Sequence, residues 1–178
     1  FGRLQTWRGI KKSNGGVAFD WGSHLIDYVL HFDTSRIKQV TGFLHRLPDS
    51  KPEFVEDHGT IRIYFESGAI ANVSVSFAAF TPPYRYHLLG SRGTLLDLWN
   101  DAQSLTVYKK LNGGETATMT VDYPDSGAHV QYYNNIADHL NNGTPLLVPP
   151  ESAAQVINVL CTAERSALND GRPEPLSD

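Results

Sequence analysis

Residues 15–27 read GGVAFDWGSHLID, and the interpretation of the whole chain starts from this stretch. If the run is helical, side chains four and three residues apart stack along one face of the helix. Asp20, His24 and Asp27 have this spacing, so we expect an acid, an imidazole and a second acid on one face. Such a face can move protons, hold a hydroxyl group or bind a metal ion.

The composition limits the classes of function. The chain has 178 residues, a length that suits one domain, so we predict a single domain over residues 1–178. The formal net charge is −4 and no Lys/Arg run exceeds a pair, which argues against nucleic acid as a partner. There is no signal-peptide pattern and no apolar run near the roughly 18 residues of a membrane span. We therefore expect a cytoplasmic protein without a membrane partner, and the single cysteine, Cys161, excludes an intramolecular disulfide.

The remaining sequence predicts strands followed by helices. Residues 1–8 could form a short edge strand, and a helix is expected from a cap at Asn14 to about Phe32. Alternating apolar residues and turn signals then predict strands at 37–44, 59–66, 69–77, 84–90, 93–98, 105–108 and 117–121, and helices at 129–140 and from about 150 to 170. This order predicts an α+β fold, a largely antiparallel open sheet with helices on one face. Such a sheet leaves an apolar face, so we expect a homodimer or homotetramer formed through strands in the 59–121 region.

Several short motifs occur along nearly the whole chain in a specific order. The first is Gly-Gly-x-x-x-Asp-x-Gly-x-His-x-x-Asp over residues 15–27. It is followed by EDH at 56–58, FESGA at 65–69, GSRGT at 90–94, NGTP at 142–145, PESAA at 150–154 and AERS at 163–166. Together these motifs resemble the C-terminal domain of the Gfo/Idh/MocA oxidoreductases, the glucose–fructose oxidoreductase and inositol dehydrogenase family.

The resemblance implies half of a two-domain enzyme for a sugar, inositol or related polyol. In this family an N-terminal Rossmann domain binds NAD or NADP and carries a lysine in a Glu-Lys-Pro motif. The C-terminal domain, of the dihydrodipicolinate reductase-like or glyceraldehyde-3-phosphate dehydrogenase-like type, contacts substrate and forms the oligomer interface. This sequence has neither Gly-x-Gly-x-x-Gly nor Glu-Lys-Pro. We therefore expect the Rossmann domain to lie outside this chain, which alone should bind no cofactor and be inactive.

The resemblance also implies roles for individual residues. It places Asp20 and His24 at the substrate and the nicotinamide, with His24 as a base and Asp20 bonding the substrate or the lysine. Asp27 is expected to orient His24 or to make a structural hydrogen bond to a loop. Trp7 and Arg8 precede the helix in a segment that borders the substrate cleft, where Arg8 is either a substrate contact or an ordinary surface arginine.

Two other interpretations remain open. A metal site could use Asp20, His24 and Asp27, with or without His58, but no HExxH motif or cysteine pair supports it, so we expect no metal. The stronger alternative is a non-enzymatic ligand-binding or oligomerisation module with a vestigial Asp/His pair. A Rossmann domain upstream would favour the enzyme, and an unrelated upstream domain would favour the module.

Overall fold

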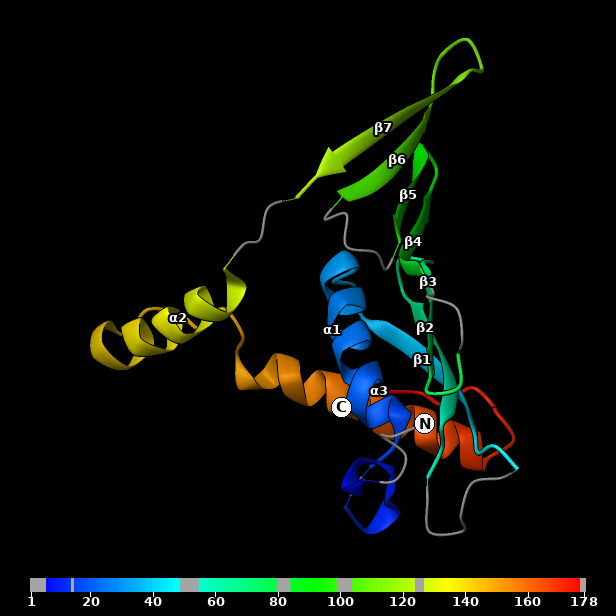
Figure 1. Ribbon diagram of the computed structural model, residues 1–178, viewed down its shortest axis with the longest axis vertical. Helices are drawn as coiled ribbons and strands as arrows, with labels where there is room; N and C mark the ends of the chain where they lie inside the picture. The colour runs from blue at the N-terminus through cyan, green and yellow to red at the C-terminus, as the bar shows by residue number, and fades with distance from the viewer. Residues whose placement is uncertain are drawn as a thin grey trace. The chain divides into compact units, whose positions relative to one another are not determined.

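The computed structural model describes residues 6–13, 15–48, 55–79, 84–98, 104–123 and 127–176 (Figure 1). The chain forms two compact units. Unit 1 consists of Phe1–Ala78 and Val148–Asp178, and unit 2 of Ala79–Leu147. Unit 2 is therefore inserted in sequence between two parts of unit 1.

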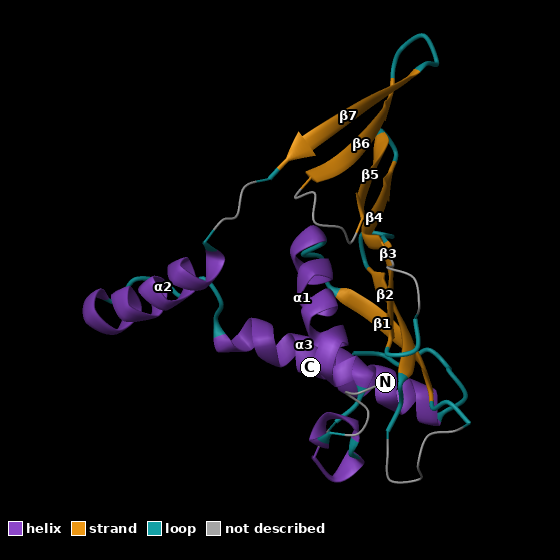
Figure 2. Cartoon of the chain, in the orientation of Figure 1, coloured by secondary structure: helices purple, strands orange, loops and turns teal. Residues whose placement is uncertain are grey.

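Unit 1 contains one antiparallel sheet, of order β1-β2-β3, and the helices that cover it (Figure 2). Its elements are the 3₁₀ turns Trp7–Gly9 and Lys11–Ser13, the π-helical turn Ala18–Gly22, α1 (Ser23–Phe32), β1 (Ile37–His45), β2 (His58–Phe65), β3 (Ile70–Ser76) and α3 (Pro150–Leu168). The expected edge strand over residues 1–8 is wrong at its C-terminal end, where Trp7 and Arg8 lie in a 3₁₀ turn. This turn is capped by Thr6, whose Oγ1 accepts from the Arg8 N–H at 3.4 Å. Residues 1–5 and the expected cap Asn14 lie outside the described residues.

The core of unit 1 lies between this sheet and the helices α1 and α3. Alternate residues of β2 point inward, because side chains on a strand alternate between its two faces, and Ile61 and Ile63 are fully buried. They belong to one apolar cluster with Ile26 of α1 and Val159 of α3. The helices therefore cover one face of the sheet, as predicted.

The other face of the β1-β2-β3 sheet is mixed in character. Arg62, Asn72 and Ser74 are exposed on it, and the Arg62 Nε donates to Asn72 Oδ1 at 2.7 Å. Phe43 and Ile70 are exposed on the same face, 48% and 57% respectively.

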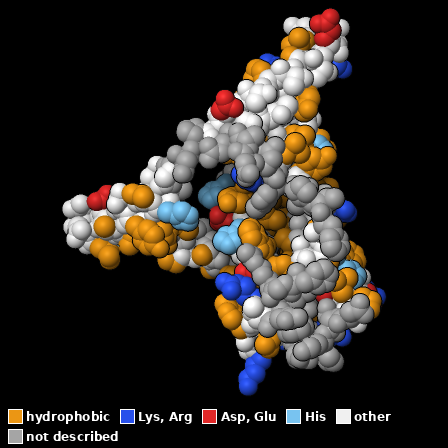
Figure 3. All heavy atoms as spheres, in the orientation of Figure 1, with side chains coloured by type: hydrophobic (Ala, Val, Ile, Leu, Met, Phe, Trp, Pro, Cys, Tyr) orange, Lys and Arg blue, Asp and Glu red, His pale blue; other side chains and the backbone are white. Residues whose placement is uncertain are grey.

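Unit 2 contains a four-stranded antiparallel meander, of order β4-β5-β6-β7, followed by α2 (Ala128–Asn142). The strands are β4 (Tyr84–Gly90), β5 (Gly93–Leu98), β6 (Ser104–Lys110) and β7 (Thr116–Asp122). Leu88, Leu95, Val107 and Met119 lie opposite one another across the four strands and form an apolar row on one face. Exposed apolar side chains also line α2, where they are orange in Figure 3.

The α+β fold with antiparallel strands is confirmed, with one difference in the sheet. The expected single sheet is divided, among the described residues, into the two hydrogen-bonded sheets of unit 1 and unit 2. All the predicted strands from residue 37 onward are present, and so are both predicted C-terminal helices. Within the described ranges, none of the helices is both long enough and apolar enough to cross a bilayer.

Candidate active site

The helix that carries the predicted site begins with a wider turn than an α-helix. Residues Ala18–Gly22 are π-helical and continue directly into α1. A π-turn bonds each residue to the fifth along instead of the fourth, and such turns are frequent at functional sites. The inserted turn changes the angular offset between Asp20 and His24 but leaves them about one turn apart on a continuous helix.

Arg8 reaches this helix from the preceding 3₁₀ turn. The Arg8 Nε lies 3.4 Å from Asp20 Oδ1, and the two side chains are 44% and 25% exposed. The Arg8 guanidinium also lies over the Trp7 ring, 4.6 Å from its centroid. The structure thus brings together three of the predicted residues, Trp7, Arg8 and Asp20.

The second oxygen of Asp20 has an unusual environment. Its Oδ2 is buried and has no hydrogen-bond partner within the described part of the chain, although the residue as a whole is only partly buried. Buried carboxylate oxygens normally accept hydrogen bonds, so an unmatched one calls for a donor. A hydroxyl group of a bound molecule could supply this donor.

His24 is exposed on the first turn of α1. Its ring lies edge-on to Trp21, with the ring centroids 6.1 Å apart. An exposed imidazole can exchange protons with a bound substrate or with water, as a general base must.

Asp27 lies one turn further along α1 and is paired with His31. The Asp27 Oδ2 is 3.8 Å from the His31 Nε2, and both side chains are well exposed. This contact runs along the exposed surface of the helix in the direction away from His24. The orienting role expected for Asp27 therefore stays a prediction, to which this structure adds a competing partner.

The two glycines of the motif allow the turn and the helix to approach each other. A Cβ atom on Gly15 would overlap the Arg8 carbonyl oxygen, and the N–H of Gly16 donates to that same oxygen at 2.7 Å. Gly16 also has a φ of +135°, which side chains disfavour. These glycines fix the Arg8 backbone against the start of the helix, and so bring its side chain to Asp20.

Sequence reasoning missed Glu56, which acts on the same helix. It was noted only as part of a motif that leads into a strand, yet its Oε1 accepts from the Ala18 N–H at 3.2 Å. Burial raises the pKa of the Glu56 carboxyl, and the nearby Glu164 and Asp57 carboxylates raise it further. The available signal was an acid a few residues before a strand, which does not reveal a partner 38 residues away.

The described residues do not form the dinucleotide-binding unit of a Rossmann domain. A dinucleotide site needs a glycine-rich loop between a strand and a helix of a parallel sheet. The described strands pair antiparallel, and α1 follows short helical turns rather than a strand. Within the described part of the chain there is also no group of three His, Cys, Asp or Glu side chains that could hold a metal ion.

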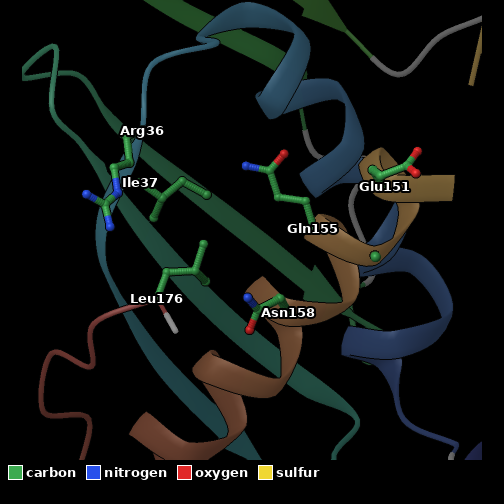
Figure 4. A pocket seen from close by; sticks show the side chains of 7 residues that line it. Arg36, Ile37, Glu151, Gln155, Asn158 and Leu176 are labelled. Atoms are coloured by element: carbon green, nitrogen blue, oxygen red, sulfur yellow. The ribbon is translucent and has the colours of Figure 1, made fainter. Parts of the chain in front are cut away.

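A separate hollow of about 310 Å³ opens elsewhere in unit 1, between β1 and α3 (Figure 4). It is lined by Arg36, Ile37, Glu151, Ala154, Gln155, Asn158 and Leu176. None of these residues belongs to the predicted site. The candidate active site therefore consists of the contacting residues Trp7, Arg8 and Asp20, with the exposed His24 about one helical turn further along.

Comparisons with known proteins agree with this architecture. A family model described as the GFO/IDH/MocA C-terminal domain matches residues 2–96. An NAD-binding protein of Listeria innocua has a similar solved structure, with 26% identity and a TM-score of 0.78 over 95% of this chain and 50% of its own. A search of curated proteins gives no match.

Two further solved structures show the same fold at lower identity. An NAD binding oxidoreductase of Klebsiella pneumoniae is 16% identical, with a TM-score of 0.79 over 97% of this chain and 54% of its own. An oxidoreductase domain protein of Kribbella flavida is 17% identical, with a TM-score of 0.78 over 97% and 53%. This chain thus spans about half the length of the structures it matches. It belongs to the GFO/IDH/MocA C-terminal domain family.

Proposed function

We propose that this chain is the substrate-binding and oligomerisation part of an NAD- or NADP-dependent oxidoreductase that acts on a sugar, an inositol or a related polyol. Its family is an oxidoreductase family, and two of the similar structures are described as NAD-binding. Because the described residues do not form the dinucleotide-binding unit of a Rossmann domain, the nicotinamide and the hydride transfer belong to another domain of the complete protein. This chain handles the hydroxyl group of the substrate.

The observation that carries the proposal is the unmatched oxygen of Asp20, about one helical turn from an exposed histidine. A substrate hydroxyl that donates to Asp20 Oδ2 would satisfy that buried acceptor. The neighbouring Arg8 contacts the other oxygen, Oδ1, at 3.4 Å and so leaves Oδ2 available to the substrate. A polyol offers adjacent hydroxyl groups, so one can bond Asp20 while the other lies near His24.

In the direction of oxidation, His24 accepts the proton of the reacting hydroxyl group. The O–H bond breaks toward an imidazole nitrogen, and the imidazolium later releases the proton to water. The oxidised nicotinamide, held by another domain, would accept the hydride from the carbon. Histidine suits this step because its unperturbed pKa lies near neutrality. In the reverse direction the imidazolium returns the proton to the carbonyl oxygen.

The test is His24→Ala in the complete protein. We expect kcat to fall about 10²–10⁴-fold, the usual effect of losing a general base, while cofactor affinity is retained. Because His24 is exposed, the melting temperature should barely change. His31→Ala, an exposed histidine on the same helix, is the matched control and should keep full activity. An unchanged kcat for His24→Ala across the pH range would rule out His24 as the base, whereas a complete wild-type protein without any turnover of polyols would favour the non-enzymatic module.

A second measurement separates this chain from the cofactor domain. Calorimetric titration of this chain alone with NAD(H) or NADP(H) should give no measurable binding, because it offers no glycine-rich phosphate loop. Micromolar binding would contradict the assignment of the cofactor to another domain.

A further inference from the structure

Glu56 lies at the start of the helix that carries Asp20 and His24. The first N–H groups of a helix have no partner within the helix, and a side-chain oxygen can satisfy them. Here the Ala18 N–H donates to Glu56 Oε1 at 3.2 Å, and Ala18 is the first residue of the π-turn. The acceptor comes from a segment 38 residues away rather than from the residue before the helix. Val17, the residue at that position, makes no side-chain cap.

The backbone around Glu56 reinforces this contact. The Val17 N–H donates to the Glu56 carbonyl oxygen at 3.4 Å, and the Val55 N–H donates to the Gly9 carbonyl oxygen at 2.9 Å. Residues 55–56 therefore join both the helix start and the turn that carries Arg8. The next residue, Asp57, is fully buried, and its carboxylate accepts from the Leu47 N–H at 2.9 Å. Glu56 is thus attached to a rigid part of the core.

Gly16 leaves the space that the Glu56 carboxylate occupies. A Cβ atom at Gly16 would overlap the Glu56 Oε1 atom. This gives the second glycine of the motif a specific task in addition to its positive φ. The glycine, the acid and the first helical N–H form one packed junction.

We propose that Glu56 is a positioning residue, which fixes the start of the helix and thereby holds Asp20 against Arg8. This inference rests on the proposed function for its catalytic consequence, but its structural part stands without it. Loss of the Glu56 acceptor frees the Ala18 N–H and loosens the π-turn. Asp20, two residues further on, then loses its fixed position relative to the Arg8 turn.

The structural part is tested by hydrogen exchange of the complete protein, followed over the amides of residues 17–22. Glu56→Ala should speed this exchange about 5- to 30-fold, the range that follows from the usual cost of losing a helix cap. Glu56→Gln keeps an oxygen at the same reach and should leave exchange near the wild-type rate. Glu66→Ala, an exposed glutamate in the β2–β3 hairpin, is the matched control and should have no effect on these amides.

Glu56→Asp covers the case in which Glu56→Ala does not fold. It keeps the charge but shortens the side chain, so the carboxylate no longer reaches Ala18 and exchange should rise. Unchanged exchange over residues 17–22 in both shortened variants would overturn the proposal. Equal acceleration in Glu56→Gln and Glu56→Asp would also overturn it, because a retained acceptor would then have no protective effect.

The catalytic part is read from kinetics of the same variants. Glu56→Ala or Glu56→Asp should raise KM and lower kcat together, and Glu56→Gln should restore both, with the pH profile set by His24 unchanged in shape. If hydrogen exchange over residues 17–22 speeds up in Glu56→Ala but KM and kcat stay unchanged, the role of Glu56 in catalysis is overturned. Its structural role at the start of the helix would then still stand. If His24→Ala has no effect while exchange responds to Glu56, the proposed function fails independently of the junction.

Discussion

Arg8 and Asp20 show how an exposed ion pair can matter more for binding than for folding. Surface pairs contribute about 0–1 kcal/mol to stability, because water screens the charges and both side chains lose freedom. At 44% exposure Arg8 falls in this class. In the proposed site, Arg8 instead contacts Oδ1 of Asp20 and so leaves Oδ2 available to bind a substrate hydroxyl group.

We therefore expect Arg8→Ala to change substrate affinity more than stability. In a double-mutant cycle with Asp20→Asn, the coupling in unfolding free energy should stay below about 1 kcal/mol, measured by denaturant unfolding. KM should rise in Arg8→Ala while the melting temperature stays close to that of the wild type. A coupling of several kcal/mol would instead identify the pair as a structural element.

At the scale of secondary structure, Asp33 links the end of α1 to the β2–β3 hairpin. Its Oδ1 accepts from Ser35 Oγ at 2.6 Å, and its Oδ2 accepts from Ser67 Oγ at 2.6 Å. These hydrogen bonds, led by the one from the Ser35 side chain, lower the pKa of the Asp33 carboxyl. The ionised form is therefore favoured in the folded state.

This shift predicts a pH-dependent contribution to stability. A lowered folded-state pKa stabilises the fold above the ordinary value of 3.8, and the contribution disappears as pH falls through the folded-state pKa. The melting temperature of wild type should exceed that of Asp33→Asn near neutral pH, and the gap should close on acidification. Ser67→Ala removes one donor and should show part of the same loss. A gap that does not vary with pH would contradict this account.

The elements were largely predictable from sequence because their signals are local. The alternation in β2 and β3 and the Ser67-Gly68 turn predicted the hairpin, and apolar spacing predicted α1 and α3. The π-turn was not predictable, since a one-residue widening hardly alters the apolar pattern. The Trp7–Gly9 turn was also mistaken for a strand, because its cap at Thr6 depends on a short local contact.

The sequence predicted which residues belong to the candidate site but not the contacts between them. The motif identified Asp20 and His24, and the resemblance added Arg8. The contact of Glu56 with Ala18 joins segments 38 residues apart, which no local pattern encodes. In our proposal, a further part of the site belongs to another domain, whose geometry could not follow from this sequence.

At the scale of the whole molecule, both units expose apolar side chains on their strands. The helix-free face of the β1-β2-β3 sheet mixes Phe43 and Ile70 with polar residues, whereas the β4–β7 sheet carries a continuous apolar row that ends at the exposed Met119. Exposed apolar surface on a folded protein commonly marks an interface. We therefore place the proposed self-association on the strands of unit 2, within the region 59–121 that the sequence indicated.

A charge on this surface should weaken the oligomer. We replace Met119, which is 58% exposed in the apolar row, by Arg. Sedimentation velocity should then show a shift from dimer or tetramer toward monomer, and circular dichroism should show that the fold is kept. Ser74→Arg, an exposed position on the helix-free face of the β1-β2-β3 sheet, is the matched control and should leave assembly intact. A wild-type protein that is monomeric at high concentration would contradict the assignment.

The insertion of unit 2 within unit 1 has a consequence for the order of synthesis. The ribosome releases α1 and β1–β3 first, yet Val159 and Leu160, which close the core against Ile26, follow only after all of unit 2. The meander of unit 2 pairs neighbouring segments and can form while it emerges, because local contacts form fastest. Until α3 is made, the core residues that α3 will cover, among them Ile26 on the helix that carries Asp20 and His24, stay exposed to water. This exposed apolar surface is a target for chaperones and for aggregation.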